Sequence, residues 1–210
     1  MNPDVLAELN ARIASCTACA LHQGRTQTVP GDGDPNAEVL FIGEAPGFHE
    51  DQQGSPFVGQ AGRVLDQLLL EIGLTRADVF VANVIKCRPP NNRDPLPEEI
   101  ATCEPFLTMQ ISGIRPKLIV TLGRFALQYF LPGTSISRSR GKVIRSDPYL
   151  LYPLYHPAAA LRQSRLFQVL RDDFQRIPQI VAGAERPDVR ATASAAAVQK
   201  EDSATQLQLL

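Results

Sequence analysis

The sequence predicts an α/β protein of three layers, with helices on both faces of a central four-stranded, mostly parallel sheet. Short apolar runs that suit buried strands alternate with longer segments whose apolar residues recur at helical spacing. The chain has 210 residues, of which 44% are hydrophobic, and a net charge of -1. It is therefore long enough for one domain with a substantial core, and its composition is that of a globular protein.

The expected strands are short and rich in branched and aromatic residues, as buried strands are. They cover residues 38–42, 78–87, 117–123 and 149–155. The expected helices cover residues 3–15, 60–72, 97–112, 123–130 and 156 to about 177. Pro97 precedes two acidic residues and suits the first turn of a helix. Pro153 indicates that the last strand lies at an edge of the sheet or ends early.

The ends of the chain differ in character from its middle. From residue 183 the sequence loses its periodicity and its aromatic residues, which predicts a single domain over 1–182 and a flexible tail over 183–210. The N-terminus lacks the basic and apolar regions of a signal peptide, and no apolar run approaches 18 residues. We therefore expect a cytoplasmic monomer that does not associate with a membrane.

Residues 43–62 form a long glycine-rich loop between the first strand and a helix. A loop of this length inside a compact domain usually has a function. Glu44 lies where the strand ends, Asn83 falls near the end of the second strand, and His156 follows the last one. Because the carboxyl ends of parallel strands meet at one edge of a sheet, we expect these three groups to form a pocket there.

Four cysteines in a cytoplasmic chain indicate metal binding or catalysis rather than disulfides. Cys16 and Cys19 have the close spacing of metal ligands, whereas Cys87 and Cys103 are far apart. Four thiolates can hold a zinc ion or a [4Fe–4S] cluster, and the spacing alone favours zinc. The alternative is that the cysteines are small buried hydrophobic residues.

Several motifs together resemble the family 4 uracil-DNA glycosylases, which are iron–sulfur enzymes of the uracil-DNA glycosylase superfamily. These motifs are GEAPG at 43–47, PFVGQAG at 56–62, NVIKCRPP at 83–90, HPAA at 156–159 and the cysteines. The resemblance runs in order over residues 16–176. It implies the three-layer fold of that superfamily, a [4Fe–4S] cluster on all four cysteines, and removal of uracil from DNA to leave an abasic site.

The resemblance also implies which residues bind a flipped-out uracil. Gly43, Glu44 and Ala45 would form the floor of the pocket, Phe57 would supply an aromatic face, and Asn83 would read the base. An amide can accept from uracil N3–H and donate to O4, and cytosine presents the opposite polarity. From the residues alone, Phe57 could instead be a core residue that anchors the loop, and the Asn83 amide could be satisfied by backbone.

The resemblance places His156 against uracil O2, where a neutral imidazole would donate a hydrogen bond to the departing anion. The alternative is a structural histidine that caps the following helix. The residue that activates water is less evident, because Ala45 stands where sister families have an aspartate. We expect Glu50 to orient water or to stabilise the sugar cation, with loop capping as its alternative role, and Glu44 to shape the pocket.

Basic residues gather in residues 138–176, around His156, and predict a surface that binds DNA phosphates; solvated surface charges are the alternative. Arg140 and Arg162 are the expected contacts. The resemblance implies that the loop after His156 enters the minor groove, with Leu161 as the wedge that fills the gap left by the flipped base; the alternative is a core residue of its helix.

Two other functions are weighed against the enzyme. One is a non-catalytic or covalently trapping iron–sulfur protein that binds uracil-containing DNA. The other is a nucleotide-binding domain, which is disfavoured because residues 43–47 do not match G-x-G-x-x-G and no Walker lysine follows. No lysine occupies a matched catalytic position, so strand cleavage is not expected.

Overall fold

The structure is a computed structural model that describes residues 1–184. Of the predicted tail, residues 185–210 lie outside this part of the chain. Within residues 1–184, no helix is both long and apolar enough to cross a membrane.

One six-stranded sheet, in the order β1-β3-β2-β4-β6-β5, forms the centre of the molecule. The four inner strands are parallel to one another, which confirms the predicted sheet. Two short strands that the sequence did not reveal add an antiparallel edge on either side. The strands are β1 Asp32–Gly33, β2 Val39–Gly43, β3 Phe80–Asn83, β4 Leu118–Leu122, β5 Ile144–Ser146 and β6 Tyr149–Leu154.

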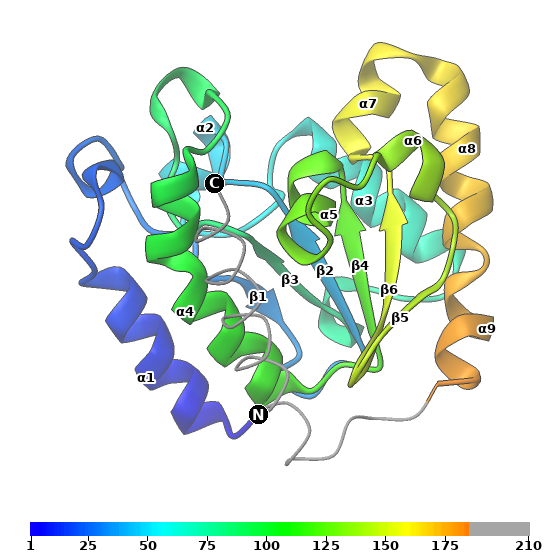
Figure 1. Cartoon of the computed structure of the whole chain (residues 1–210), viewed down its shortest axis with the longest axis horizontal. Coiled ribbons are helices and arrows are strands. Elements are labelled where there is room, and N and C mark those ends of the chain that lie inside the picture. Colours follow the sequence, from blue (N-terminus) through cyan, green and yellow to red (C-terminus); the bar gives the residue numbers. More distant parts are fainter. Residues whose placement is uncertain (185–210) are drawn as a thin grey trace, which may run out of the picture.

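Helices cover both faces of the sheet, as predicted for three layers (Figure 1). The α-helices of the described chain are α1 Pro3–Ala14, α2 Phe48–Gln53, α3 Gln60–Glu71, α4 Pro97–Ile114, α5 Arg124–Phe130, α6 Ile136–Ser139, α7 Pro157–Arg162, α8 Ser164–Phe174 and α9 Ile177–Ala182. Short 3₁₀ turns lie at Ala20–Gln23, Arg76–Asp78 and Pro90–Asn92.

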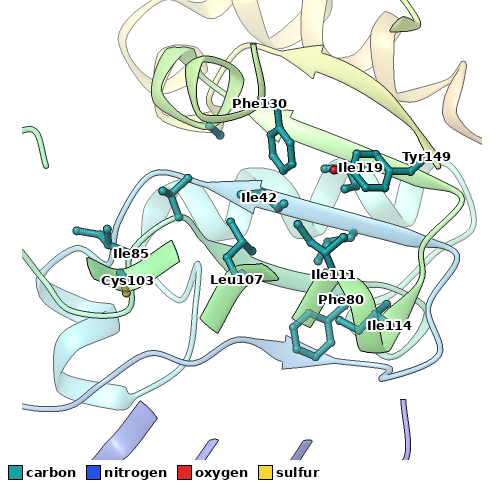
Figure 2. Close-up of a cluster of buried hydrophobic side chains, with 14 of the residues drawn as sticks. Ile42, Phe80, Ile85, Cys103, Leu107, Ile111, Ile114, Ile119, Phe130 and Tyr149 are labelled. Carbon is teal, nitrogen blue, oxygen red and sulfur yellow. The ribbon is translucent and has the colours of Figure 1, made fainter. Parts of the chain in front are cut away.

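Alternation of side chains along the inner strands divides the core into two halves. Leu40 and Ile42 of β2 face α4 and α5, whereas Val39 and Phe41 face α3 and α8. Figure 2 shows the first half, in which side chains from the sheet pack against those of α4. Because every residue of β2, β3 and β4 is buried, these strands read as continuous apolar runs.

Three predictions about elements are wrong. The predicted helix from 156 to about 177 is two helices, because Gln163 has extended backbone (φ -142°, ψ 106°). The break lets α7 and α8 pack against each other and both against α3. The second strand ends at Asn83 rather than at residue 87. The strand that contains Pro153 is not at the edge, but β5 pairs only with residues 149–151, so the proline lies beyond that ladder.

The carboxyl ends of the parallel strands all lie at one edge of the sheet, together with α2 and α7 (Figure 1). Gly43 and Asn83 end the neighbouring strands β2 and β3 and are register partners. His156 follows β6 and caps α7. The loop after β2 holds the short helix α2 and then turns back into α3. The fold therefore brings the predicted pocket residues together.

Candidate functional site

A pocket of about 340 Å³ opens at this edge of the sheet, a volume typical of a small-molecule site. All the predicted uracil-binding residues except Gly43 line it. Its wall consists of Glu44, Ala45, Pro46, Gly47, Glu50, Phe57, Ala61, Asn83, Pro89, Asn92, Arg93, His156 and Ala158.

Gly43 lies directly beneath the pocket wall. A Cβ atom at this position would lie 2.4 Å from Oδ1 of Asn83 and 2.7 Å from Cζ of Phe57. Only a glycine therefore lets the amide and the aromatic ring approach the end of β2.

Gly43→Ala is expected to lower the free energy of unfolding by about 1–3 kcal/mol, because the added methyl group must displace a buried ring and a buried amide. Urea denaturation measures this change. Gly24→Ala is the matched control, since a Cβ there meets nothing within 4 Å. Equal stability of the two variants would show that the pocket wall is free to shift.

The amide of Asn83 is buried, with 2% of the residue exposed, and it makes no hydrogen bond with any other described residue. It is not satisfied by backbone, which was the alternative interpretation. A buried amide is almost always paired, so an open one that lines a pocket indicates a ligand.

The backbone at Asn83 is fixed by a buried lysine that sequence reasoning missed. Lys86 is 1% exposed, and its Nζ donates to the Asn83 carbonyl and to Oε1 of Gln110, each at 2.7 Å. Gln110 in turn donates to the Pro30 carbonyl. Burial lowers the pKa of Lys86 to about 8. A lysine inside a strongly apolar run is the signal that could have revealed this support.

Phe57 is 6% exposed and lies at φ 53°, a conformation that a bulky residue rarely adopts. Arg76 holds it there by donating to the carbonyls of Phe57 (2.8 Å) and Pro56 (3.3 Å). Gly62 allows α3 to begin against it, because a Cβ would lie 1.7 Å from the Phe57 carbonyl oxygen. Phe57 thus anchors the loop and also lines the pocket, and its role as the aromatic face for a base stays a prediction. Nothing in the sequence pointed to Arg76.

The ring of His156 stacks on that of Phe57, with centroids 5.4 Å apart and 25° between the planes. The backbone N–H of Ala158 donates to Nδ1 of His156 at 3.1 Å, so the side chain caps α7. Burial lowers the pKa of His156 to about 4, although the charge of Glu50 opposes this shift. The imidazole is therefore neutral at pH 7, and its proton is on Nε2 because Nδ1 accepts.

The two carboxylates of the pocket have different surroundings. Burial raises the pKa of Glu44 to about 7, with a further rise from Asp94 and an opposing effect of Arg124. Glu50 accepts hydrogen bonds through Oε1 from the backbone N–H groups of Val58 (2.9 Å) and Gly59 (3.0 Å). Glu50 therefore caps the loop that precedes α3 while it lines the pocket, and Glu44 is the carboxylate whose protonation changes near neutral pH.

The predicted DNA contacts lie in different settings. Leu161 is 48% exposed on α7, so it is not the core residue of its helix that was the alternative. Arg162 is exposed beside it and makes no ion pair within the described chain. Arg140, by contrast, pairs with the buried carboxylate of Asp173 at 2.5 Å and packs over Tyr155. Its guanidinium group is thus already engaged in contacts within the protein.

The four cysteines line one small cavity, although they come from distant parts of the sequence. Two of their sulfur atoms accept hydrogen bonds, Cys87 from Arg25 and Cys103 from the backbone N–H of Lys86, each at 3.2 Å. Burial raises the pKa of both thiols, that of Cys103 to about 11. His22 is half-buried and lines the same cavity.

In residues 1–184, no three metal-binding side chains lie close enough together to hold a single ion. The four thiols nevertheless meet in one cavity, and two of their sulfur atoms accept hydrogen bonds from the protein, as the sulfur ligands of metal groups commonly do.

An aromatic face, an open amide and a histidine with a fixed donor meet in one pocket at the carboxyl edge of a parallel sheet. The pocket therefore has the groups needed to stack on a planar ring and to hydrogen-bond to its polar edge. The sequence profile of the uracil DNA glycosylase superfamily matches residues 30–177. The chain belongs to this superfamily.

Among the chain's relatives are several proteins named Type-4 uracil-DNA glycosylase. That of Sulfurisphaera tokodaii is 46% identical, covering 87% of this chain and 88% of its own. That of Archaeoglobus fulgidus is 45% identical, with coverage of 87% and 96%. That of Saccharolobus solfataricus is also 45% identical, with coverage of 86% and 87%.

Proposed function

We propose that this protein is a uracil-DNA glycosylase that hydrolyses the N-glycosidic bond of uracil in DNA and leaves an abasic site. The observation that carries the proposal is the buried, unpaired amide of Asn83 in one pocket with Phe57 and His156. The similarity to Type-4 uracil-DNA glycosylases supports it. We further propose that the protein acts as a monomer in the cytoplasm.

The pocket recognises the base by its flat face and by the hydrogen-bonding groups of its Watson–Crick edge. A uracil flipped out of DNA stacks on Phe57, and its N3–H and O4 meet the amide of Asn83. The amide pairs with both atoms at once. With cytosine, the amide oxygen would face the N3 acceptor and the amide N–H would face the N4 donor, and these buried groups would stay unpaired. Gly43, Glu44 and Ala45 form the floor, with Gly43 beneath the ring and the amide.

Cleavage leaves negative charge on the departing uracil, and His156 stabilises it. Nε2 carries the proton because Nδ1 is engaged with Ala158, so the ring donates to O2 without changing its protonation state. A preorganised donor in a buried site strengthens its hydrogen bond as the charge develops.

The sugar becomes positively charged, and a nearby carboxylate group stabilises that charge. Glu50 lies in the same pocket, interacts electrostatically with His156 and orients water toward the sugar. Glu44 adds a second negative charge above its raised pKa.

The rate of cleavage in a single turnover is expected to rise with pH and to level off above about 7, since a carboxyl group with a raised pKa is charged only above it. Glu44→Gln is expected to flatten this profile and to lower the plateau about a hundredfold. Glu98→Gln, exposed in the first turn of α4, is the control. If the Glu44→Gln variant keeps the wild-type profile, Glu44 only shapes the pocket.

Contact with DNA is proposed at α7, with Leu161 as the wedge and Arg162 on the phosphates. The exposure of both side chains supports this, as does the electrostatic effect of Arg162 on the pocket residue His156. For Arg140, a contact with DNA remains a prediction, and its pair with Asp173 argues for a structural role.

We propose that Cys16, Cys19, Cys87 and Cys103 hold a [4Fe–4S] cluster. All four line one cavity. Held by these cysteines, a cluster would tie the end of α1 to α4 and to the segment after β3. When bound, it supplies a rigid link that leaves the chemistry at the pocket to the protein's side chains.

Cys16→Ala is expected to lose iron and sulfide, of which the wild type holds about four each, and to unfold at a lower temperature. Thr17→Ala, at an exposed neighbouring residue, should retain both. Elemental analysis, visible absorbance and thermal unfolding measure these outcomes. Purified protein with one zinc ion and no iron would contradict the cluster.

The function is tested by incubating the protein with labelled uracil oligonucleotides, single-stranded and duplex, followed by a denaturing gel with and without alkali. Alkali-dependent strand scission is the expected result. Intact DNA from cluster-loaded protein would favour a binding protein without catalysis, and a species that resists denaturation would indicate covalent capture.

A further inference from the structure

Phe48 is an aromatic residue that the proposed chemistry does not use. It begins α2 and is 51% exposed, and it is the one aromatic side chain among the large, exposed hydrophobic residues of the described chain. It directly follows Gly47, which lines the pocket. The ring is therefore accessible to a ligand that extends out of the pocket past Gly47.

A guanidinium lies against this ring. The Cζ of Arg88 is 5.1 Å from the centroid of Phe48, although Phe48 begins α2 and Arg88 lies in the segment after β3. The Nε of Arg88 donates to Oδ1 of Asn92 at 2.7 Å, and Asn92 itself lines the pocket. Arg88 makes no ion pair with any described residue, so its charge is available.

Together these two residues have the chemistry of a nucleotide platform. An aromatic face accepts any base by stacking, and an unpaired guanidinium beside it attracts a phosphate. The pocket lies between this platform and α7, because Glu50 of α2 and Ala158 of α7 both line it. A strand whose uracil enters the pocket therefore has one neighbour near Leu161 and the other near Phe48.

We propose that Phe48, backed by Arg88, stacks on the nucleobase next to the flipped uracil and does so on an unpaired strand. The inference rests on the proposed function and deepens it. In a duplex the neighbouring base is already stacked and paired, so the platform gains less there. The platform thus gives the enzyme a preference for single-stranded over duplex substrate.

The test uses the holoenzyme and a single-stranded oligonucleotide with 2′-fluoro-2′-deoxyuridine, which resists cleavage, next to 2-aminopurine on one side or the other. Stacking on Phe48 quenches 2-aminopurine fluorescence on one side only. Phe48→Ala is expected to lose this quenching and to weaken binding about fivefold to a hundredfold, and Phe48→Trp is expected to restore both. The loss of affinity on duplex DNA should be several-fold smaller.

Leu70→Ala is the matched control, because Leu70 is 65% exposed on α3 and is not part of the pocket. Thermal unfolding verifies that each variant is folded. If Phe48→Ala binds the oligonucleotide and quenches its fluorescence like the wild type, the proposal that Phe48 stacks on the neighbouring base is wrong. If the wild type fails to cleave a normal uracil oligonucleotide but Phe48→Ala still loses quenching, the proposed catalysis is wrong while the platform stands.

Discussion

Asn83→Asp is expected to lower the single-turnover rate on uracil by at least about a thousandfold. Aspartate has the size of asparagine, so the pocket keeps its shape. It cannot donate to O4, however, and its charge repels that oxygen. The side-chain amide of Asn83 is buried and makes no hydrogen bond within the described residues, so the variant loses the amide donor that this side chain offers to O4. Uracil O4 is then buried without a donor, so the variant incurs the full free energy of desolvating that oxygen and not only the net loss of one hydrogen bond.

Cleavage of matched uracil and cytosine oligonucleotides measures the effect. The ratio of uracil to cytosine cleavage should fall in the variant, since aspartate accepts from the cytosine amino group. Asn2→Asp serves as control, because Asn2 is exposed and caps α1 through an acceptor that aspartate retains. An unchanged uracil rate in Asn83→Asp would show that the base is read elsewhere.

His156→Ala is expected to reduce the single-turnover rate about a hundredfold to a thousandfold, through loss of one preorganised donor to the leaving uracil. The pH dependence distinguishes the protonation states. Because burial lowers the pKa of His156 to about 4, the ring stays neutral as pH rises through 5 to 9. The ratio of wild-type to variant rate should therefore be constant over that range. A ratio that falls above pH 6.5 would mean that a charged imidazole acts.

His156 also caps α7, so its removal affects stability. His156→Asn separates the two roles, because asparagine is a good cap but its amide is too short to occupy the place of Nε2. We expect this variant to unfold like the wild type and still to lose most of the rate. Recovery of the rate in His156→Asn would assign His156 to capping alone.

Most of the fold could be predicted from the sequence because the strongest patterns are local. Each inner strand is a short apolar run, and α3 and α4 show the periodicity of one buried face, so neighbours in the chain suffice to predict them. Edge strands were missed for the same reason. The two residues of β1 have no pattern of their own and pair only because β3 presents a free edge.

The single helix predicted after His156 illustrates the limit. Its apolar pattern continues through Gln163, but α7 and α8 each pack against α3, and packing outweighs the weak local preference for one straight helix.

For the site, the sequence determined the residue types and their order: Glu44, Asn83 and His156 each follow a strand, and parallel topology places strand ends together. Their protonation states and hydrogen-bond partners could be assigned only from the tertiary structure. Burial lowers the pKa of His156 and raises that of Glu44, and the contact with Ala158 fixes which nitrogen carries the proton. Desolvation and hydrogen-bond partners depend on the whole surrounding shell, which comes from distant segments, and no local pattern encodes it.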